Sequence, residues 1–238
     1  MRMPNFELQV VIPVYNEQAT LADLIGDWRR IFQDIPVRHR FIFVDDGSTD
    51  NSLSLLQSIQ SQSEDIFICS QPNGGHGPAI LTGYSLAIQS GSSWIFQIDS
   101  DHQLDPAAFA SLWTNRLQYD LLMGERQEKY ATIWRRLVSN LSFGLVRFFY
   151  GKGIKDVNSP YRLYKTSLLA RALPKIPTLS FAPNVLLSSW FLRHKAAIFL
   201  APVDTRKGIH PRLSRMNSYF LKGSLTALLQ TLSFRFRS

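Results

Sequence analysis

The chain has 238 residues, 45% of them hydrophobic and 18% charged, which excludes a disordered protein and leaves room for a full hydrophobic core. Its single cysteine, Cys69, excludes an internal disulfide framework and a zinc site built from several cysteines. The formal charge of +8 is unevenly placed: residues 157–238 hold 13 Lys/Arg and one acid, whereas residues 1–156 hold 13 Lys/Arg and 17 acids. This asymmetry favours an anionic partner for the C-terminal third, namely phosphate groups, nucleic acid or an acidic membrane face.

Short apolar runs and helical patterns alternate along the first 125 residues. The runs predicted as strands are 8–14, 41–44, 66–69, 94–98 and 120–123. The segments predicted as helices are 17–32, 50–60, 78–90 and 106–117. Asp50 and Asp105 occupy expected N-cap positions, and Pro106 suits a first helical position. The alternation predicts an α/β fold in which a mostly parallel sheet carries helices on both faces.

Polar residues follow each of the five predicted strands. The five clusters are 13–17, 45–50, 73–77, 99–103 and 124–126. Ligands of such sheets bind beyond the carboxyl ends of the strands, so we expect the clusters to meet at one site.

Asp99 and Asp101 form an Asp-x-Asp at the end of a predicted buried strand. Two carboxylates held close together repel one another unless a divalent cation neutralises them, and oxygen ligands suit Mg²⁺ or Mn²⁺. The alternative is a helix-capping loop with incidental acids. Their position between a strand and a helix favours the metal site.

The glycine-rich run 73–78 has neither the dinucleotide-binding spacing nor the lysine of a phosphate-binding P-loop. Its glycines, Gly77 among them, favour a turn or a close approach of the backbone to a ligand. His76 and His102 are interpreted as polar residues at the rim, because no second His or Cys stands at a metal-binding spacing.

In this order, VIPVYNEQATL, FVDDGSTDNS, the Asn-Gly-Gly-His-Gly loop and FQIDSDHQLDP resemble the GT-A glycosyltransferases of family 2. The nearest branch is that of the polyprenyl-phosphate sugar transferases, which includes dolichol-phosphate mannose synthase. The resemblance covers residues 8 to about 165 and extends weakly to about 216. It implies a single GT-A domain that binds a nucleotide-diphosphate sugar (a UDP- or GDP-sugar) together with Mg²⁺ or Mn²⁺.

The resemblance also implies roles for individual residues on the donor side. Those expected to bind the donor are Pro13, Tyr15, Glu17, Asp45, Asp46, Gly77, Ser100 and Gln103. Asp45 and Asp46 correspond to the acidic pair that reads base and ribose. Asp99 and Asp101 correspond to the metal ligands, and Arg126 to an arginine beside the donor phosphates.

On the acceptor side, the segment from Asp156 to Arg162 resembles the branch's Asp-x-x-x-Gly-Phe-Arg, with Pro-Tyr in place of Gly-Phe. Both end residues are expected at the catalytic site. Segments 206–208 and 214–216 resemble a phosphate-clamping Arg-x-x-Gly-x-Ser-Lys element, at a longer spacing. The residues expected to bind an acceptor phosphate are Arg206, Lys207, Arg212, Ser214 and Arg215.

The absence of acids from residues 157–203 bears on the acceptor. Transfer onto a hydroxyl needs a general base, for which Asp156, Asp204 and His210 remain candidates. A phosphate acceptor needs no base, because its second pKa of about 6 makes it a dianion near neutral pH. Arginines bind such oxygens well. The predicted reaction is therefore inverting transfer of a hexose to a polyprenyl phosphate.

Two basic amphipathic stripes predict a peripheral membrane contact, one over 133–149 and one over 221–232. An ordinary core-facing stripe is the alternative reading. The predicted division is a GT-A domain over 1–216 and a basic amphipathic helix or tail over 217–238. With no spanning run and no leader, the expected location is the cytoplasm, at the inner face of the membrane.

Three other readings stay open on the sequence alone. The acceptor is a saccharide or lipid hydroxyl in the first. In the second the basic C-terminal third binds nucleic acid, although the chain has no recognisable nucleic-acid module and the acidic strand ends would repel a phosphate backbone. In the third the protein binds a sugar nucleotide without turnover. We expect no nucleic-acid partner.

Overall fold

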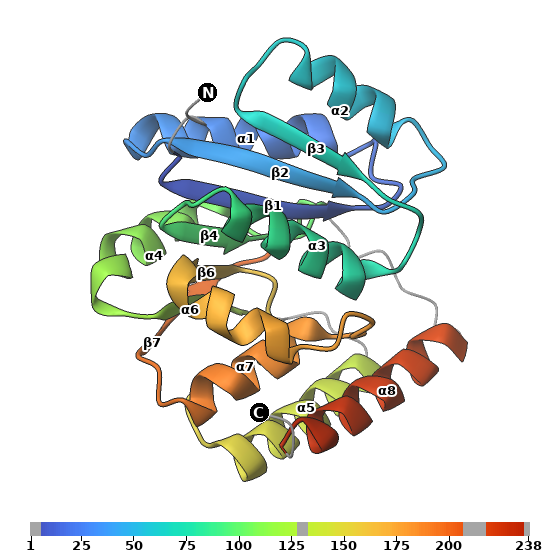
Figure 1. Ribbon diagram of the computed structural model, residues 1–238, viewed down its shortest axis with the longest axis vertical. Coiled ribbons are helices and arrows are strands. Elements are labelled where there is room, and N and C mark those ends of the chain that lie inside the picture. Colours follow the sequence, from blue (N-terminus) through green and yellow to red (C-terminus); the bar gives the residue numbers. More distant parts are fainter. Residues whose placement is uncertain (1–5, 128–132, 207–217, 236–238) are drawn as a thin grey trace.

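The structure is a computed structural model that describes residues 6–127, 133–206 and 218–235. One seven-stranded sheet organises the fold (Figure 1). Its strands are β1 (Leu8–Val14), β2 (His39–Asp45), β3 (Ile66–Ser70), β4 (Trp94–Gln97), β5 (Leu121–Arg126), β6 (Arg162–Lys165) and β7 (Ile198–Val203). They lie in the order β3-β2-β1-β4-β6-β5-β7, and only β6 runs antiparallel to its neighbours.

Helices cover both faces of the sheet, as the alternation predicts. The helices are α1 (Leu21–Asp34), α2 (Ser52–Gln60), α3 (His76–Gln89), α4 (Phe109–Asn115), α5 (Ile133–Tyr150), α6 (Thr166–Ala172), α7 (Pro183–Arg193) and α8 (Ser218–Phe234). Alternate residues of β1 enter two different apolar clusters: Leu8, Val10 and Ile12 pack with α1 and α4, and Val11 packs with α3 and α7. The expected mostly parallel α/β sheet is confirmed.

The five predicted strands and four predicted helices are all present, with shifted ends. The largest shift is at α1, which begins at residue 21 rather than 17 because Asn16 has a positive φ of 56° and residues 15–20 form a loop. The predicted helix 106–117 is α4 flanked by single 3₁₀ turns. Its N-cap is confirmed, since Asp105 Oδ1 accepts a 2.9 Å hydrogen bond from the Ala107 amide.

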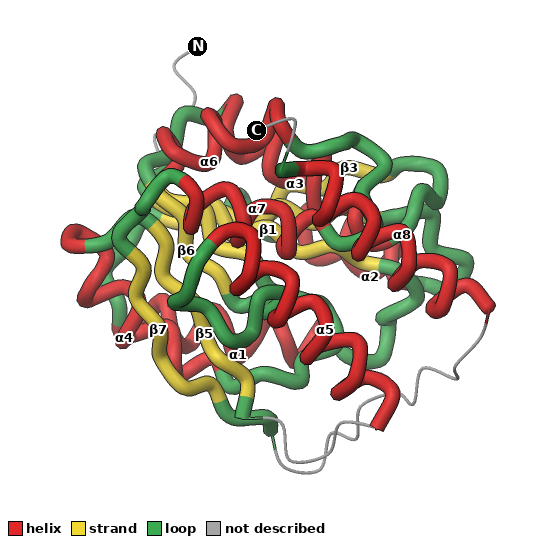
Figure 2. Tube along the Cα trace, turned by 90° about the horizontal axis from the view of Figure 1, so that it is seen from below, coloured by secondary structure: helices red, strands yellow, loops and turns green. Residues whose placement is uncertain are grey.

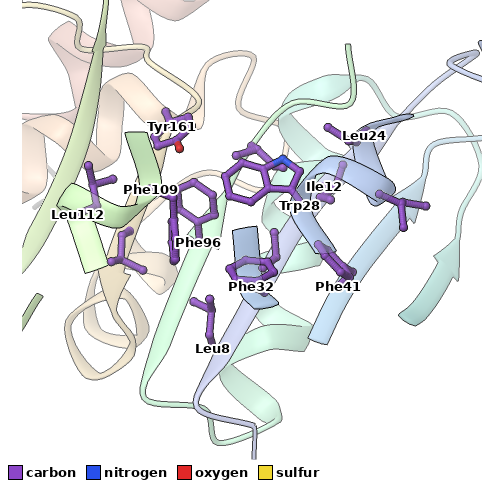
Figure 3. Close-up of a cluster of buried hydrophobic side chains, with 14 of the residues drawn as sticks. Leu8, Ile12, Leu24, Trp28, Phe32, Phe41, Phe96, Phe109, Leu112 and Tyr161 are labelled. Atoms are coloured by element: carbon purple, nitrogen blue, oxygen red, sulfur yellow. The ribbon is translucent and has the colours of Figure 1, made fainter. Parts of the chain in front are cut away.

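An aromatic cluster fixes α1 and α4 on the sheet (Figure 3). The Trp28 ring of α1 lies 5.2 Å from the Phe96 ring of β4 and 5.8 Å from the Phe109 ring of α4, both edge to face. Tyr161, just before β6, contacts Phe96 in the same way at 4.9 Å. These rings hold α1 against the strand that leads into the two aspartates.

Helices α5 and α8 lie side by side at one end of the molecule (Figures 1 and 2). Helix α8 also packs on α7, and its Gly223 is so close to the Phe181 ring that a Cβ there would meet ring carbons at 2.1 Å. A helix thus occupies most of the predicted tail, while the division at residue 216 stays a prediction. Among the described residues, no helix is both long enough and apolar enough to cross a membrane.

Candidate active site

A cavity of about 490 Å³ opens at the carboxyl ends of β1, β2 and β4, where the polar clusters were expected to meet. It is lined by Pro13, Val14, Tyr15, Glu17, Asp46, Asn73, Gly75, His76, Ala79, Asp99, Ser100 and Asp101. Four of the five predicted clusters therefore contribute residues to one cavity. Asn73 and His76 line it as part of the cluster predicted after β3, although neither is among the individual residues expected to bind the donor.

Asp99 and Asp101 lie where β4 gives way to the loop before α4. The buried Oδ1 of Asp99 has no hydrogen-bond partner among the described residues, and His76 Nε2 lies 3.4 Å from it. Asp101 Oδ1 accepts a 3.2 Å bond from the Gln103 amide. Burial, together with the neighbouring charge of Asp99, raises the pKa of Asp101 to about 6.

These two carboxylates fit a hard divalent cation. The buried oxygen of Asp99 lacks a donor and the ionised form of Asp101 is disfavoured, and a cation would offset both costs. Over the described part of the chain, no group of three or more acidic, His or Cys side chains is placed to hold a metal. One or two carboxylates suffice for Mg²⁺, which commonly completes its shell with water and substrate phosphates.

The loops around the cavity are bound to one another by side-chain hydrogen bonds. Asn16 Oδ1 accepts the Thr49 amide at 2.7 Å, and the Glu17 amide donates to Ser52 Oγ at 2.9 Å, so the loop after β1 is joined to the loop after β2. Thr20 Oγ1 donates to the carbonyl of Ser100 at 2.9 Å. The cavity wall is therefore preorganised before any ligand enters.

The acidic pair after β2 supports the wall of the cavity. Asp46 accepts hydrogen bonds from the amides of Gly74 at 3.0 Å and Gly75 at 2.8 Å, and from Gln71 Nε2 at 2.7 Å. Asp45 is buried, bonds to Ser70 Oγ at 3.1 Å and does not line the cavity. Asp46 thus shapes the glycine loop and also faces the cavity.

Gly77 is required by a protein contact rather than by an approach to the cavity. A Cβ at this position would lie 1.9 Å from the Ser180 carbonyl oxygen. The first turn of α3 therefore packs directly on the segment before α7. Gly77 is not part of the cavity lining, so its contact with the donor stays a prediction.

Arg126 and Asp156 form a two-pronged ion pair. Arg126 Nε donates to Asp156 Oδ2 at 2.7 Å, and Nη2 donates to Oδ1 at 2.9 Å. Both oxygens of Asp156, one of the candidate bases, are thus engaged by a guanidinium, which fixes the fifth polar cluster to the segment before β6.

Arg162 is fully buried, which corrects the expectation that it contacts a substrate. Its guanidinium donates to the carbonyls of Ser159 at 2.5 Å and Val157 at 2.6 Å, and to Ser188 Oγ at 3.0 Å. Its role is to hold the turn before β6 against α7. The sequence could not show that Arg162 is buried, because the motif 156–162 reads the same whether its arginine contacts a substrate or the protein interior.

Gln103 lies outside the cavity lining, and its carbonyl accepts the Arg206 amide at 2.8 Å. Arg206 binds the carboxylate of Asp27 and contacts His102. The other residues expected to bind the acceptor phosphate, Lys207, Arg212, Ser214 and Arg215, lie outside the described residues, as does His210.

Comparison with known proteins agrees with this architecture. The profile of Glycosyl transferase family 2 matches residues 9–173, and the chain belongs to this family. The fold is that of the GT-A glycosyltransferases. Mannosyl-3-phosphoglycerate synthase from Rubrobacter xylanophilus superposes with a TM-score of 0.71 at 15% identity, over 98% of this chain and 74% of that one. Glucosyl-3-phosphoglycerate synthase from Mycobacterium tuberculosis was solved with Mn²⁺, UDP and phosphoglyceric acid. It superposes with a TM-score of 0.68 at 19% identity, over 97% of this chain and 78% of that one.

Sequence relatives with a curated name point to one kind of sugar transferase. Undecaprenyl-phosphate 4-deoxy-4-formamido-L-arabinose transferase from Pseudomonas aeruginosa is 29% identical over 97% of this chain. The protein of the same name from Edwardsiella ictaluri is 28% identical over 84% of it. The chain spans 67% of the length of the first and 61% of the second.

Proposed function

We propose that this glycosyltransferase transfers a hexose from a nucleotide-diphosphate sugar to a polyprenyl phosphate at a membrane surface, with inversion at the sugar carbon. The donor half rests on the cavity, where two aspartates face the ends of β1 and β2. The acceptor half rests on one observation: the likeness to undecaprenyl-phosphate sugar transferases runs along 97% of the chain.

The residues divide the work as follows. The cavity binds the nucleotide and its diphosphate, and Asp99 and Asp101 would hold Mg²⁺ or Mn²⁺ there. The ion supplies charge that stabilises the departing diphosphate. Arg126, fixed in orientation by Asp156, presents a cation beside the fifth strand end. An oxygen of the acceptor phosphate forms the new bond to the sugar carbon as the bond to the diphosphate breaks.

The state of Asp156 favours a phosphate acceptor over a hydroxyl. Both of its oxygens accept hydrogen bonds from Arg126, so they are engaged by the guanidinium rather than open to the proton of an acceptor hydroxyl. A phosphate dianion needs no base at neutral pH. The pairing therefore agrees with the lack of acids over 157–203.

Membrane contact is part of the proposal and rests on α5 and α8. Their exposed apolar side chains are Leu141, Phe148, Leu225, Leu229 and Leu232. Residues 133–155 and 218–235 contain no acid, and the Arg235 guanidinium lies 5.2 Å from the Phe149 ring. An apolar surface bordered by cations suits an anionic bilayer. We place this contact on the inner face of the membrane.

Nucleotide release tests the proposal directly. The purified protein is offered a panel of UDP- and GDP-sugars with Mn²⁺, with and without undecaprenyl phosphate, and released nucleoside diphosphate is measured. We expect release that requires the lipid phosphate and is lost in Asp101→Asn. Asp34→Asn, which removes an exposed acid from α1, is the matched control and should keep full activity. Release without the lipid phosphate would contradict the acceptor assignment.

A further inference from the structure

Next to the loop that carries Asp99 and Asp101, three polar side chains from distant parts of the chain meet: Asp27, His102 and Arg206. Asp27 of α1 is only 12% exposed, and its Oδ2 lies 3.1 Å from His102 Nε2. The same oxygen accepts a hydrogen bond from Arg206, whose guanidinium also contacts His102. Asp27 Oδ1 is bound by Arg30 at 2.5 Å. One carboxylate of α1 thus holds a residue of the loop after β4 and a residue just beyond β7.

The geometry of His102 links this cluster to the metal ligands. His102 directly follows Asp101, is only 6% exposed and has a positive φ of 56°. A non-glycine residue adopts this conformation at a cost, so the surrounding contacts must hold it there. The contact with Asp27 is one such restraint, because it draws the side chain toward α1 and away from the solvent.

The loop is also packed closely on α1. Leu24, Trp28, Asp101 and His102 enclose a void of only about 10 Å³, at most the space of one water molecule (Leu24 and Trp28 are labelled in Figure 3). Thr20, directly before α1, adds its bond to the Ser100 carbonyl. With so little free space, a shift of His102 would move Asp101.

Arg206 extends the cluster to the end of β7. The Arg206 amide donates to the Gln103 carbonyl at 2.8 Å, and Leu104 pairs with Thr205 in an antiparallel bridge. Burial alone would raise the pKa of Asp27, but the hydrogen bond and charge of Arg206 hold it below its usual range. The guanidinium of Arg206 therefore binds Asp27, whereas the sequence led us to expect that it binds an acceptor phosphate.

We propose that Asp27 is a positioning residue of this enzyme: through His102 it fixes the loop that carries Asp99 and Asp101 in the geometry that binds the divalent cation. Asp27 itself does not line the cavity and touches no substrate there. The inference rests on the metal-binding part of the proposed function. It does not depend on the identity of the sugar acceptor.

The test is the affinity for Mn²⁺ alone, measured from the electron paramagnetic resonance signal of free Mn²⁺ as protein is added. Residues that orient metal ligands typically change metal affinity by about 10- to 100-fold when they are replaced. We expect Asp27→Asn to weaken Mn²⁺ binding about tenfold. His102→Ala removes the same contact and leaves the carboxylate of Asp27 in place. If it weakens Mn²⁺ binding equally, the effect comes from lost positioning of the loop and not from the lost charge of Asp27.

Two controls keep the result interpretable. Asp65→Asn breaks another ion pair of the same helix, Arg29 with Asp65 at 2.8 Å, and should lower the unfolding temperature while leaving the Mn²⁺ affinity within twofold. The Asp27→Asn, His102→Ala double variant should bind Mn²⁺ about as weakly as either single variant, because both remove one interaction. If Asp27→Asn does not fold, His102→Ala carries the same expectation.

Unchanged Mn²⁺ affinity in Asp27→Asn or His102→Ala would overturn the inference, as would equal weakening in Asp65→Asn. Wild-type protein that binds no Mn²⁺ would overturn it as well. Normal Mn²⁺ binding without transfer to undecaprenyl phosphate would instead refute the proposed acceptor and leave the role of Asp27 intact.

Discussion

At the residue scale, the buried position of Asp101 costs stability at neutral pH, as expected for the metal ligand that we propose it to be. Burial and the charge of Asp99 raise its pKa to about 6 from the usual value of 3.8, so the folded protein binds this proton more tightly than the unfolded chain. The stability that this group contributes is present below about pH 4 and is lost as the pH rises to about 6. Functional residues commonly carry such a cost.

Asp101→Asn should therefore stabilise the metal-free protein at pH 7, by no more than about 3 kcal/mol for a pKa raised by about two units. Thermal unfolding with and without EDTA measures this. Mn²⁺ binding by the wild type should weaken about tenfold for each pH unit below about 6, because a proton competes for the carboxylate. A destabilised metal-free Asp101→Asn variant, or Mn²⁺ affinity that is flat from pH 7 to pH 5, would contradict the assignment.

At the scale of elements, α3 depends on one close backbone contact. Gly77→Ala would place a Cβ 1.9 Å from the Ser180 carbonyl oxygen, so the first turn of α3 must move. Overpacking of this kind typically costs about 1–3 kcal/mol. Because His76 and Gly75 of the same turn line the cavity, we expect both the stability and the affinity for a nucleoside diphosphate to fall.

Gly26→Ala is the matched control for this prediction. Gly26 lies in α1 with nothing within 4 Å of the position of an added Cβ, so alanine should stabilise the helix by about 0.5–1 kcal/mol. Chemical denaturation and isothermal titration with UDP would compare the two variants. Equal effects of the two substitutions would show that the contact with Ser180 does not matter.

The sequence predicts elements well where a pattern is local. The strand β1 has the predicted bounds, and the cap at Asp105 forms as its side chain and Pro106 indicate. It does not predict β6, whose four residues are too few to show alternation and whose antiparallel pairing depends on β4 and β5. Nor does it show that Arg162 is buried against Ser188 of α7 or that Arg206 binds Asp27, since those contacts join residues far apart in the chain.

At the scale of the whole molecule, the apolar side chains of α5 and α8 predict binding to anionic vesicles. Phe148 is 80% exposed on α5, so Phe148→Asp should weaken co-sedimentation with phosphatidylglycerol vesicles by about tenfold or more. Leu117, equally exposed but just after α4, provides the control, and Leu117→Asp should bind as the wild type does. Equal losses in the two variants would argue against a defined membrane face.

The uneven distribution of charge along the chain corresponds to two different parts of the molecule. Four acids of the first two thirds, Glu17, Asp46, Asp99 and Asp101, line the cavity, whereas α5 and α8 carry none. The two helices pack on α7 and on each other, away from the outer strand β3 (Figure 1). The molecule thus presents the cavity proposed to bind the donor and, separately, an acid-free pair of helices proposed to contact the membrane.

The most direct test of the central claim compares undecaprenyl phosphate with undecaprenol as acceptor, using the donor that supports nucleotide release. The lipid product is identified by mass spectrometry. We predict one sugar added to the lipid phosphate, dependent on Asp101, and no product from the alcohol. Glycosylated undecaprenol, or transfer only to a saccharide, would show that the enzyme uses a hydroxyl acceptor and would contradict the account.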